Sequence, residues 1–494
     1  MTSKTTSTMK ITLLLSSLFI GMNSFSQTII WGPEITVSDG SLYGNYRPRA
    51  TVVDGDVPLV IYGKGGFENI FISRWNGTGF DTPMGIIPAG ESSYIAVWTG
   101  PDIASKGDTV VAVFKLDPLD EKNVYSVRSV DGGLTFSDTI RVDSHNSGIA
   151  WMPSIEMDAD GNPVVASMIH DANWANPRYA LTHSSDAGLT YNGEVEVASS
   201  VPGEACDCCS AEVAIDGQRQ LLLFRNNEFN IRDIFGVLST DGGATFPTYT
   251  NIDNMAWQIS GCPSTGADAI FMGDNLITTY ASAANGPYRV YVSTSSTTSG
   301  LVFDTREMVT EPIPSQGGQN FPTISGANDT IVMAWMEADN LNKDIYYSVS
   351  VPGVNHLDAL TNYKHKGNLT TTGTQTNPEI IYKNGIVHLF FQDNSTGNLL
   401  YRRGTIDLNL ELTENLASIG VYPNPSSNGV FYIQNDLNTE LISIKNSIGQ
   451  SISFNIKESN GGLLLKLMTT SKGIYFLSYF TKDGIQKTTT LLVN

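Results

Sequence analysis

Four cysteines are the residues of this 494-residue chain whose clustering most directly predicts chemistry. Cys206, Cys208 and Cys209 lie close together, and Cys262 follows more than 50 residues later. Four cysteines can pair in three ways, and adjacent cysteines rarely bond to each other because the geometry is strained. We therefore expect a disulfide from one of the first three to Cys262. The alternative is a thiolate site for copper or zinc, since C-x-C-C and a distant cysteine supply enough sulfur ligands.

Charged and aromatic side chains form a second group of candidates for binding or catalysis. Arg47, Arg225 and Arg232 could together hold a carboxylate, or could have structural roles. His170 beside Asp171 has the composition of a general base with its orienting carboxylate, but it is equally a turn feature. Four aromatic residues could stack on a sugar or pack between strands: Tyr46, Trp151, Trp174 and Trp257.

The composition favours many short strands and argues against two classes of protein. Hydrophobic residues make up 41%, charged residues only 16%, and 46 glycines supply turns. A formal net charge of −20 makes nucleic acid an unexpected partner, because phosphate contacts need clustered lysine and arginine. No segment has the long apolar run of a membrane-spanning helix. Apart from the metal alternative at the cysteines, we expect no cofactor.

The N-terminus has the features of an export signal. Lys10 precedes the apolar run Ile11–Ile20, and Ser24-Phe25-Ser26 fits a small-x-small cleavage site. The apolar run is too short to span a membrane. Residues 1–26 are therefore predicted to be a signal peptide, which places the cysteines in an oxidising compartment and favours the disulfide.

A unit of strands repeats along residues 27–411. Its copies begin at or near Arg47, Tyr94, Met152, Cys209, Cys262, Phe321 and Asn377. Four strands per copy, repeated radially, form a β-propeller. The segment Pro33–Ser38 is expected to complete the last blade and so remove an open sheet edge. We predict an all-β fold with a propeller of seven blades, six blades being the alternative.

Three of the turns between third and fourth strands share the motif S-x-D-x-G-x-T-aromatic. Their aspartates, Asp131, Asp186 and Asp241, are 55 residues apart. An aspartate can accept backbone N–H bonds inside a tight turn, and glycine adopts the positive φ that the turn requires. The motif resembles the Asp-box, or BNR repeat, of sialidase-like propellers. The resemblance covers about residues 28–410 and implies that these aspartates are structural and lie away from the active face.

The opposite face, where the first strands begin around the channel mouth, is the expected place for a ligand. A sialidase needs an arginine cluster, a tyrosine with a glutamate, and an acid aspartate. Tyr46-Arg47-Pro48 resembles the start of true sialidases without its isoleucine, and no tyrosine–glutamate pair can be assigned. We expect a propeller that recognises a glycan or another extracellular polymer. The alternatives are an exo-sialidase or related glycoside hydrolase, and a metal- or redox-linked propeller.

Residues 412–494 break the repeat and form a second unit. Their prolines, glycines and asparagines punctuate six or seven predicted strands, which indicates a small β-sandwich. The segment resembles the type A sorting domain of the type IX secretion system, with Y-P-N-P, G-Q, G-I-Y-F-L and a terminal apolar strand in that order. The resemblance implies the type IX machinery as a partner, and a final location outside the cell or on the outer-membrane surface.

Overall fold

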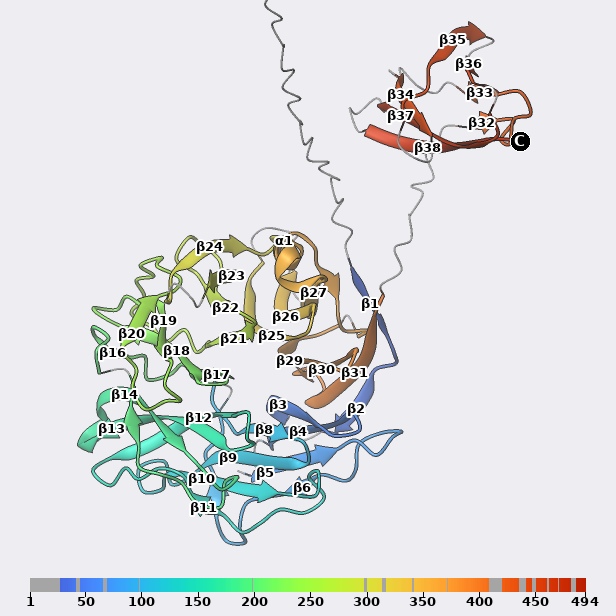
Figure 1. The fold of residues 1–494 in the computed structure, drawn as a ribbon. Coiled ribbons are helices and arrows are strands. Elements are labelled where there is room, and N and C mark those ends of the chain that lie inside the picture. Colours follow the sequence, from blue (N-terminus) through green and yellow to red (C-terminus); the bar gives the residue numbers. More distant parts are fainter. Residues whose placement is uncertain are drawn as a thin grey trace, which may run out of the picture. The chain divides into compact units, whose positions relative to one another are not determined.

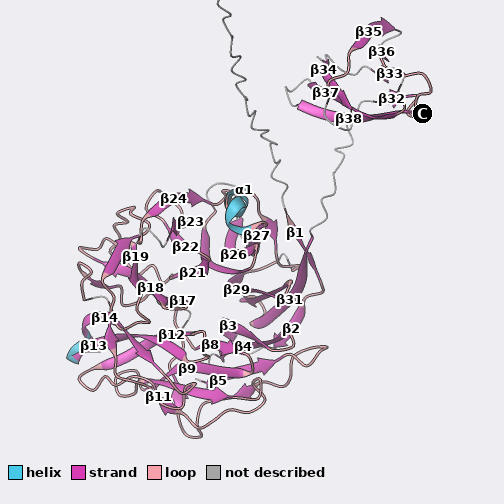
Figure 2. Cartoon of the chain, viewed as in Figure 1, coloured by secondary structure: helices cyan, strands magenta, loops and turns pink. Residues whose placement is uncertain are grey.

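The computed structural model divides the chain into two compact units, Met1–Leu408 and Asn409–Asn494. It describes residues 27–40, 45–64, 69–96, 98–197, 199–296, 300–312, 317–339, 342–370, 372–407, 420–434, 441–446, 450–459, 462–469, 471–480 and 486–494. The predicted signal peptide lies outside these residues. Within them the secondary structure is almost entirely strand (Figure 2), and the only α-helix is α1 (Asp358–Asn362).

Antiparallel sheets radiate around a central axis in the first unit (Figure 1). The first blade consists of β3 (Asn45–Val53), β4 (Val57–Lys64), β5 (Asn69–Arg74) and β6 (Met84–Gly85). The second consists of β7 (Ser92–Ser93), β8 (Asp102–Lys106), β9 (Thr109–Asp117), β10 (Val124–Ser129) and β11 (Ile140–Arg141). The third consists of β12 (Ile149–Met157), β13 (Pro163–Asp171), β14 (Ala175–His183) and β15 (Val195–Glu196).

The remaining blades follow the same order around the axis. The fourth consists of β16 (Glu204–Ala205), β17 (Glu212–Asp216), β18 (Arg219–Asn227), β19 (Ile234–Ser239) and β20 (Thr248–Asn251). The fifth consists of β21 (Ala267–Met272), β22 (Asn275–Ser282), β23 (Arg289–Ser296) and β24 (Phe303–Met308). The sixth consists of β25 (Gln319–Ala327), β26 (Thr330–Asp339), β27 (Asn342–Ser350) and β28 (His365–Lys366). The seventh contains β29 (Gln375–Lys383), β30 (Ile386–Asp393) and β31 (Asn398–Asp407).

Strands from the beginning of the unit complete the seventh blade. β1 (Thr28–Trp31) and β2 (Ile35–Ser38) both pair with β31, with Thr28 opposite Asp407 and Ile35 opposite Tyr401. The predicted closure by Pro33–Ser38 is therefore confirmed. The described part of this unit contains the seven predicted blades, and the pairing covers the edge that β31 would otherwise expose.

Two predicted starts are wrong by several residues. The start near Cys262 precedes β21, which begins at Ala267, and the start in the second blade differs by more. The sequence places the inner strand of the second blade near Tyr94, but β8 begins at Asp102. The apolar residues after Tyr94 turn back on themselves, because Ala96 and Thr99 bridge each other, and Tyr94 donates its N–H to the carbonyl of Lys115. An apolar run alone does not distinguish a strand from a packed turn.

The hydrophobic core lies between neighbouring blades. Leu59 and Ile61 of β4, for example, pack in one cluster with Val110 and Phe114 of β9, and all four are fully buried. Each blade thus buries both faces against its neighbours, which holds the inner strands in place around the channel.

Four inner strands carry the same irregularity near their first residues. Arg47, Met152, Phe321 and Asn377 each precede a proline and have φ values of 48° to 52°. The ladder register shifts at these points, as in a β-bulge. Non-glycine residues in this left-handed region are strained, and such strain concentrates at functional sites. The repeated bulge therefore directs attention to this end of the channel.

The three Asp-box turns have one hydrogen-bond pattern. Each aspartate accepts from the serine hydroxyl two residues before it at 2.7 to 2.8 Å. It also accepts from the backbone N–H and the hydroxyl of the threonine four residues after it, at 2.8 to 3.0 Å and 2.6 Å respectively. Asp131, Asp186 and Asp241 therefore tie each turn together internally.

Acid is expected to weaken these turns. The Thr190 hydroxyl and N–H lower the pKa of Asp186 to about 2, and Thr245 acts likewise on Asp241. Because an unfolded aspartate titrates near pH ~4, their stabilising effect is complete above that pH and is lost as pH falls towards 2. Replacing Asp186 by alanine should lower the melting temperature at neutral pH. The further fall of the melting temperature in acid should then be smaller than in the unaltered chain. Circular dichroism melts at several pH values test this, with the exposed Asp138→Ala as control; equal melting of both variants at neutral pH would contradict it.

The second unit is a small β-sandwich, as predicted. One sheet consists of β32 (Val421–Tyr422), β33 (Val430–Gln434), β36 (Gly462–Leu467) and β35 (Phe454–Ser459), and the other of β34 (Leu441–Asn446), β37 (Gly473–Phe480) and β38 (Gln486–Val493). Phe431 and Leu465 from the first sheet share a buried cluster with Leu477 and Leu491 from the second. Across both units, no helix among the described residues has the length and hydrophobicity to cross a membrane.

Candidate functional site at the mouth of the propeller

The channel mouth is lined by the starts of several inner strands and by the loops before β17 and β21. A small hollow of about 50 Å³ there is bordered by Arg47, Arg49, Ser210, Ser264, Thr265, Asp268, Phe321 and Asn377. Residues far apart in the sequence therefore meet at one end of the axis, as the propeller prediction requires.

Arg47 is a desolvated cation at this mouth. It donates hydrogen bonds to the carbonyl oxygen of Trp98 and to the Ser210 hydroxyl, the latter at 3.4 Å. Among the described residues it forms no ion pair with a carboxylate. Burial, helped by the charge of Arg49, lowers its pKa to about 10. Tyr46, the residue before it, is half-buried and lies opposite Gly63 in the ladder.

A ring of charged residues lines the channel beyond the mouth, around a cavity of about 350 Å³. Arg49 of β3 is its central cation. It contacts Glu379 at 2.9 Å, Glu212 at 3.5 Å and Asp102 at 4.0 Å, measured between guanidinium nitrogens and carboxylate oxygens. Two further carboxylates, those of Glu156 and Asp268, line the same cavity. Three acidic groups thus contact Arg49, and two more line the same cavity.

The acidic groups of this ring differ in their roles. Asp102 accepts the N–H of Ile155 at 3.0 Å, and Asp268 accepts the N–H of Ile324 at 2.8 Å, so each joins its blade to the next. Burial raises the pKa of Glu156 and of Glu379 to about 7. Burial also raises the pKa of Glu212 well above its usual range, although Arg49 opposes this.

This ring was not predicted from the sequence, although a signal for part of it was present. Arg49, Asp102 and Glu379 each follow directly after the proline that marks a strand start. Superposing the repeat copies on that proline places Arg49 and Glu379 at one level of the channel, and Asp102 joins them once Pro101, not Tyr94, is taken as the start of the second copy. The predicted site residue at the first start, Arg47, instead precedes the proline.

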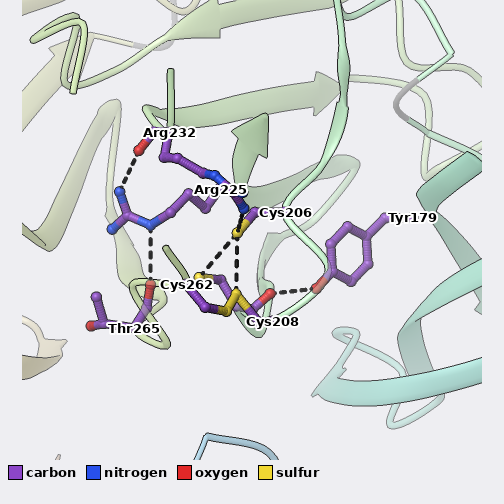
Figure 3. The surroundings of a disulfide bond; sticks show 8 residues. Tyr179, Cys206, Cys208, Arg225, Arg232, Cys262 and Thr265 are labelled. Carbon is purple, nitrogen blue, oxygen red and sulfur yellow. Dashed lines mark hydrogen bonds between the residues drawn. A yellow bond between two sulfur atoms is a disulfide. The ribbon is translucent and has the colours of Figure 1, made fainter. Parts of the chain in front are cut away.

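The three candidate arginines do not converge. Arg225 is fully buried and donates to the carbonyl oxygens of Thr265 at 3.2 Å and Arg232 at 2.6 Å (Figure 3). It also donates to the carbonyl oxygen of Ala281 at 2.9 Å. Its guanidinium also lies over the ring of Trp257, 5.1 Å from the centroid. Because Thr265 and Ala281 belong to the fifth blade's segment, Arg225 holds the fourth and fifth blades together.

His170 and Asp171 do not form a base–carboxylate pair with each other. The buried His170 ring accepts a hydrogen bond from Trp151 Nε1 at 3.0 Å, and burial lowers its pKa. Asp171 instead accepts from Asn176 at 2.7 Å and contacts Arg178 at 3.0 Å. The structure therefore gives the two neighbours separate partners.

The candidate tryptophans differ in their exposure. Trp151 and Trp257 are only 6% and 4% exposed, and Trp151 packs edge-on against Trp174 with ring centroids 5.6 Å apart. Trp174, which ends the short 3₁₀ turn η1 (Ala172–Trp174), is 38% exposed and has a φ of 61°. Only this third tryptophan offers substantial ring surface to solvent.

A groove of about 470 Å³ lies between the third and fourth blades. Phe229, on the turn between β18 and β19, lines it and is 86% exposed. Glu228 and Ile231 close this two-residue turn by mutual backbone hydrogen bonds, and Phe229 and Asn230 have φ values of 54° and 65°. Such turns usually use Asn-Gly, so an exposed phenylalanine there is unusual. The sequence contained no periodic signal for it.

The charged side chains of the groove carry excess negative charge, and other polar side chains line it beside apolar ones. Arg178 ion-pairs with Glu196 at 3.1 Å. Glu204 and Glu228 add two further carboxylates, and Asn176, Asn226 and Asn227 contribute amides. The groove therefore offers hydrogen-bond donors and acceptors but repels anions.

The cysteines form a compact cluster between the fourth and fifth blades (Figure 3). Cys208 and Cys262 are joined by a disulfide, with Cα atoms 6.2 Å apart, as one of the pairings left open by the sequence. Cys206 and Cys209 are free and buried. The sulfur atoms of Cys206, Cys208 and Cys209 lie within 4.8 Å of one another, but Cys208 is not available as a thiolate ligand for copper or zinc while it is bonded to Cys262. Arg232 donates a hydrogen bond to Cys206 Sγ at 2.8 Å.

Residues 420–494 match the family of secretion system C-terminal sorting domains. The second unit is a type IX sorting domain. Its presence makes the chain a cargo of the type IX secretion system, delivered outside the cell or to the cell surface. The match covers the second unit alone.

No curated protein matches the chain. Solved structures similar to it include a protein of unknown function from Dyadobacter fermentans, with 12% identity over 76% of this chain and 99% of that one, at a TM-score of 0.44. An α-L-arabinofuranosidase from Fusarium graminearum has 13% identity over 68% and 99%, at 0.43. A sialidase from Streptococcus pneumoniae has 10% identity over 66% and 71%, at 0.45.

Proposed function

We propose that the exported propeller binds an uncharged extracellular glycan in the groove between its third and fourth blades. The observation that carries this proposal is Phe229. A bulky residue in the left-handed region costs on the order of 1 kcal/mol, which a glycine would avoid. An aromatic ring held in such a turn and left almost wholly in solvent is explained if a ligand covers it.

The dimensions and lining of the groove suit a sugar. A volume of about 470 Å³ falls within the usual range of ligand sites. An aromatic ring can cover the apolar face of a pyranose or furanose, as aromatic rings do at other amphipathic interfaces. Asn176, Asn227 and Arg178 supply polar groups for the hydroxyls. Trp174, exposed on the neighbouring turn, would extend the same surface.

The charge of the groove favours an uncharged glycan over an acidic one. Glu196, Glu204 and Glu228 outnumber the single cation Arg178 among the lining residues. A sialic acid or uronic acid carboxylate would be repelled there, and the net charge of −20 adds to the repulsion.

The exo-sialidase alternative has less support. Of its three candidate arginines, only Arg47 lies at the mouth, whereas Arg225 is bonded to backbone carbonyls and Arg232 to Cys206. A single desolvated arginine can orient a carboxylate but does not form the cluster that sialic acid recognition needs.

Replacing Phe229 by alanine should reduce glycan affinity by about tenfold or more, since one aromatic anchor contributes roughly 1.4 kcal/mol or more. The exported chain would first be screened on an array of neutral and sialylated glycans, and the best ligand titrated by calorimetry. Leu134→Ala is the matched control, because Leu134 is 57% exposed but lies in an Asp-box turn on the opposite face.

A second variant separates binding from folding. Phe229→Gly removes the ring and relieves the left-handed strain, so it should lose affinity while keeping or raising the melting temperature. Unchanged affinity in both Phe229 variants, or a preference for sialylated over neutral glycans on the array, would refute the proposed site.

A further inference from the structure

We propose that the four cysteines form a thiol–disulfide relay, in which the buried pair Cys206 and Cys209 exchanges electrons with external disulfides through the Cys208–Cys262 bond. This inference is independent of glycan binding. It assigns a redox chemistry to a cluster that the propeller fold alone does not require.

The geometry places Cys206 between two possible sulfur partners. Its Sγ lies 3.5 Å from Cys208 Sγ, which belongs to the disulfide, and 3.5 Å from Cys209 Sγ, which is a free thiol. Thiol–disulfide exchange requires direct attack of one sulfur on another. Cys206 can therefore attack Cys208 of the disulfide, and once a Cys206–Cys208 bond has formed, Cys209 is placed to attack Cys206 in turn (Figure 3).

Burial divides the cluster into an inner and an outer part. Cys206 and Cys209 are 0% and 1% exposed, and Cys208 is 9% exposed. Cys262 is exposed. Cys262 is therefore the cysteine of this cluster that an external disulfide or thiol approaches most easily, whereas the two inner cysteines are covered. The outer disulfide is the path by which the inner pair communicates with solvent.

The electrostatic environment selects Cys206 as the attacking thiolate. The hydrogen bond with the Cys209 thiol, together with the nearby Arg232 guanidinium, lowers the pKa of Cys206. Burial raises the pKa of Cys209. A thiolate beside an arginine is the reactive form of cysteine, and Cys209 is then the resolving thiol that acts second.

Each step of the relay balances. The Cys206 thiolate attacks Cys208 Sγ, forming a Cys206–Cys208 bond and releasing Cys262 as a thiolate. Cys209, losing its proton to solvent, attacks Cys206 Sγ, forming Cys206–Cys209 and releasing Cys208 as a thiolate. Cys262 then attacks an external disulfide, releasing one thiol, and Cys208 attacks the mixed disulfide at Cys262, releasing the second. The net change oxidises two protein thiols and reduces one external disulfide.

The relay adjoins the channel mouth through both of its loops. Ser210, the residue after Cys209, contacts Arg47, and Thr265, three residues after Cys262, contacts Arg225. While Cys208–Cys262 is open, the covalent tie between these two loops is lost. The redox state of the cluster can therefore alter the shape of the mouth.

The first test uses the unaltered full chain. The protein is equilibrated with graded ratios of reduced and oxidised glutathione, quenched in acid, alkylated and mapped by mass spectrometry. We expect glutathione adducts on Cys262, and a Cys206–Cys209 disulfide in the most oxidising buffers. Adducts on Cys206 or Cys209, thiols there at every ratio, or stoichiometric copper or zinc on these sulfurs would each overturn the relay.

The second test removes the path while keeping the inner pair. In Cys208→Ser/Cys262→Ser, oxidation of Cys206 and Cys209 by oxidised glutathione should slow by about tenfold or more, because no accessible sulfur remains. Arg232→Gln should also slow oxidation and shift its pH profile upward, whereas Arg232→Lys should restore most of the rate. Arg403→Gln, at an exposed arginine, is the control, and equal rates in all variants would overturn the relay.

Discussion

Replacing Arg225 by alanine is expected to prevent stable folding of the propeller. The side chain is fully buried and donates to the carbonyls of Thr265, Arg232 and Ala281. Each buried carbonyl left without a partner costs about 1–3 kcal/mol, and the lost contact with Trp257 adds to this. The sum approaches the whole stability of a typical domain, about 5–15 kcal/mol.

The measurement is the soluble yield of the full chain, followed by urea unfolding of whatever is recovered. Arg403→Ala serves as the control, since Arg403 also lies in a blade strand, β31, but its side chain is exposed. If Arg225→Ala folded with unchanged stability and lost only ligand binding, the arginine would belong to a binding site and our structural assignment would be wrong.

Replacing Arg49 by methionine is expected to destabilise the propeller in a pH-dependent way. The arginine faces Glu379, Glu212 and Asp102, and removing one partner of a buried ion pair costs about 3–5 kcal/mol. The side chains involved are 12–21% exposed to the channel, so water moderates the effect. The loss should be largest in mild alkali, where the carboxylates are ionised.

The sign follows from proton binding. Burial raises the pKa of Glu156 and Glu379 to about 7, above the value of about 4.3 in an unfolded chain. The folded state therefore binds more protons than the unfolded state, and stability declines as pH rises from about 4 through 7. Without Arg49 this decline should steepen.

Urea unfolding at about pH 5 and about pH 8 tests the prediction. Arg49→Met should cost far more at the higher pH, and Glu156→Gln should flatten the decline of the otherwise unaltered chain and stabilise it in mild alkali. An equal cost of Arg49→Met at both pH values, with no effect of Glu156→Gln, would show that the ring does not titrate as described.

Of the two arginines in these predictions, one was a site candidate from the sequence and the other was not. Arg225 was a candidate for carboxylate binding, because an arginine's type and approximate place in the repeat are visible in the sequence. Its actual partners are backbone carbonyls, two of them in the fifth blade and one in its own, and the residue types do not predict such contacts. Arg49 was not singled out at all, although it directly follows the proline that marks the first strand start.

Local and periodic patterns determined the architecture. Alternating apolar runs predict the strands, the spacing of Asp131, Asp186 and Asp241 predicts the repeat, and the Y-P-N-P and G-I-Y-F-L segments predict the sorting domain. Strand formation and tight turns depend on a few neighbouring residues, so these features can be predicted from the sequence. The ring closure by Pro33–Ser38 follows because an unpaired edge is unfavourable.

Only the tertiary structure decided which side chains meet. How far each blade rotates about the axis determines that Cys208 pairs with Cys262 while Cys206 and Cys209 stay free thiols. It also determines which carboxylates lie around Arg49. The exposure of Phe229 depends on a single left-handed turn. These contacts join residues that are tens to hundreds of positions apart in the sequence. A local sequence pattern does not determine the distances between such residues.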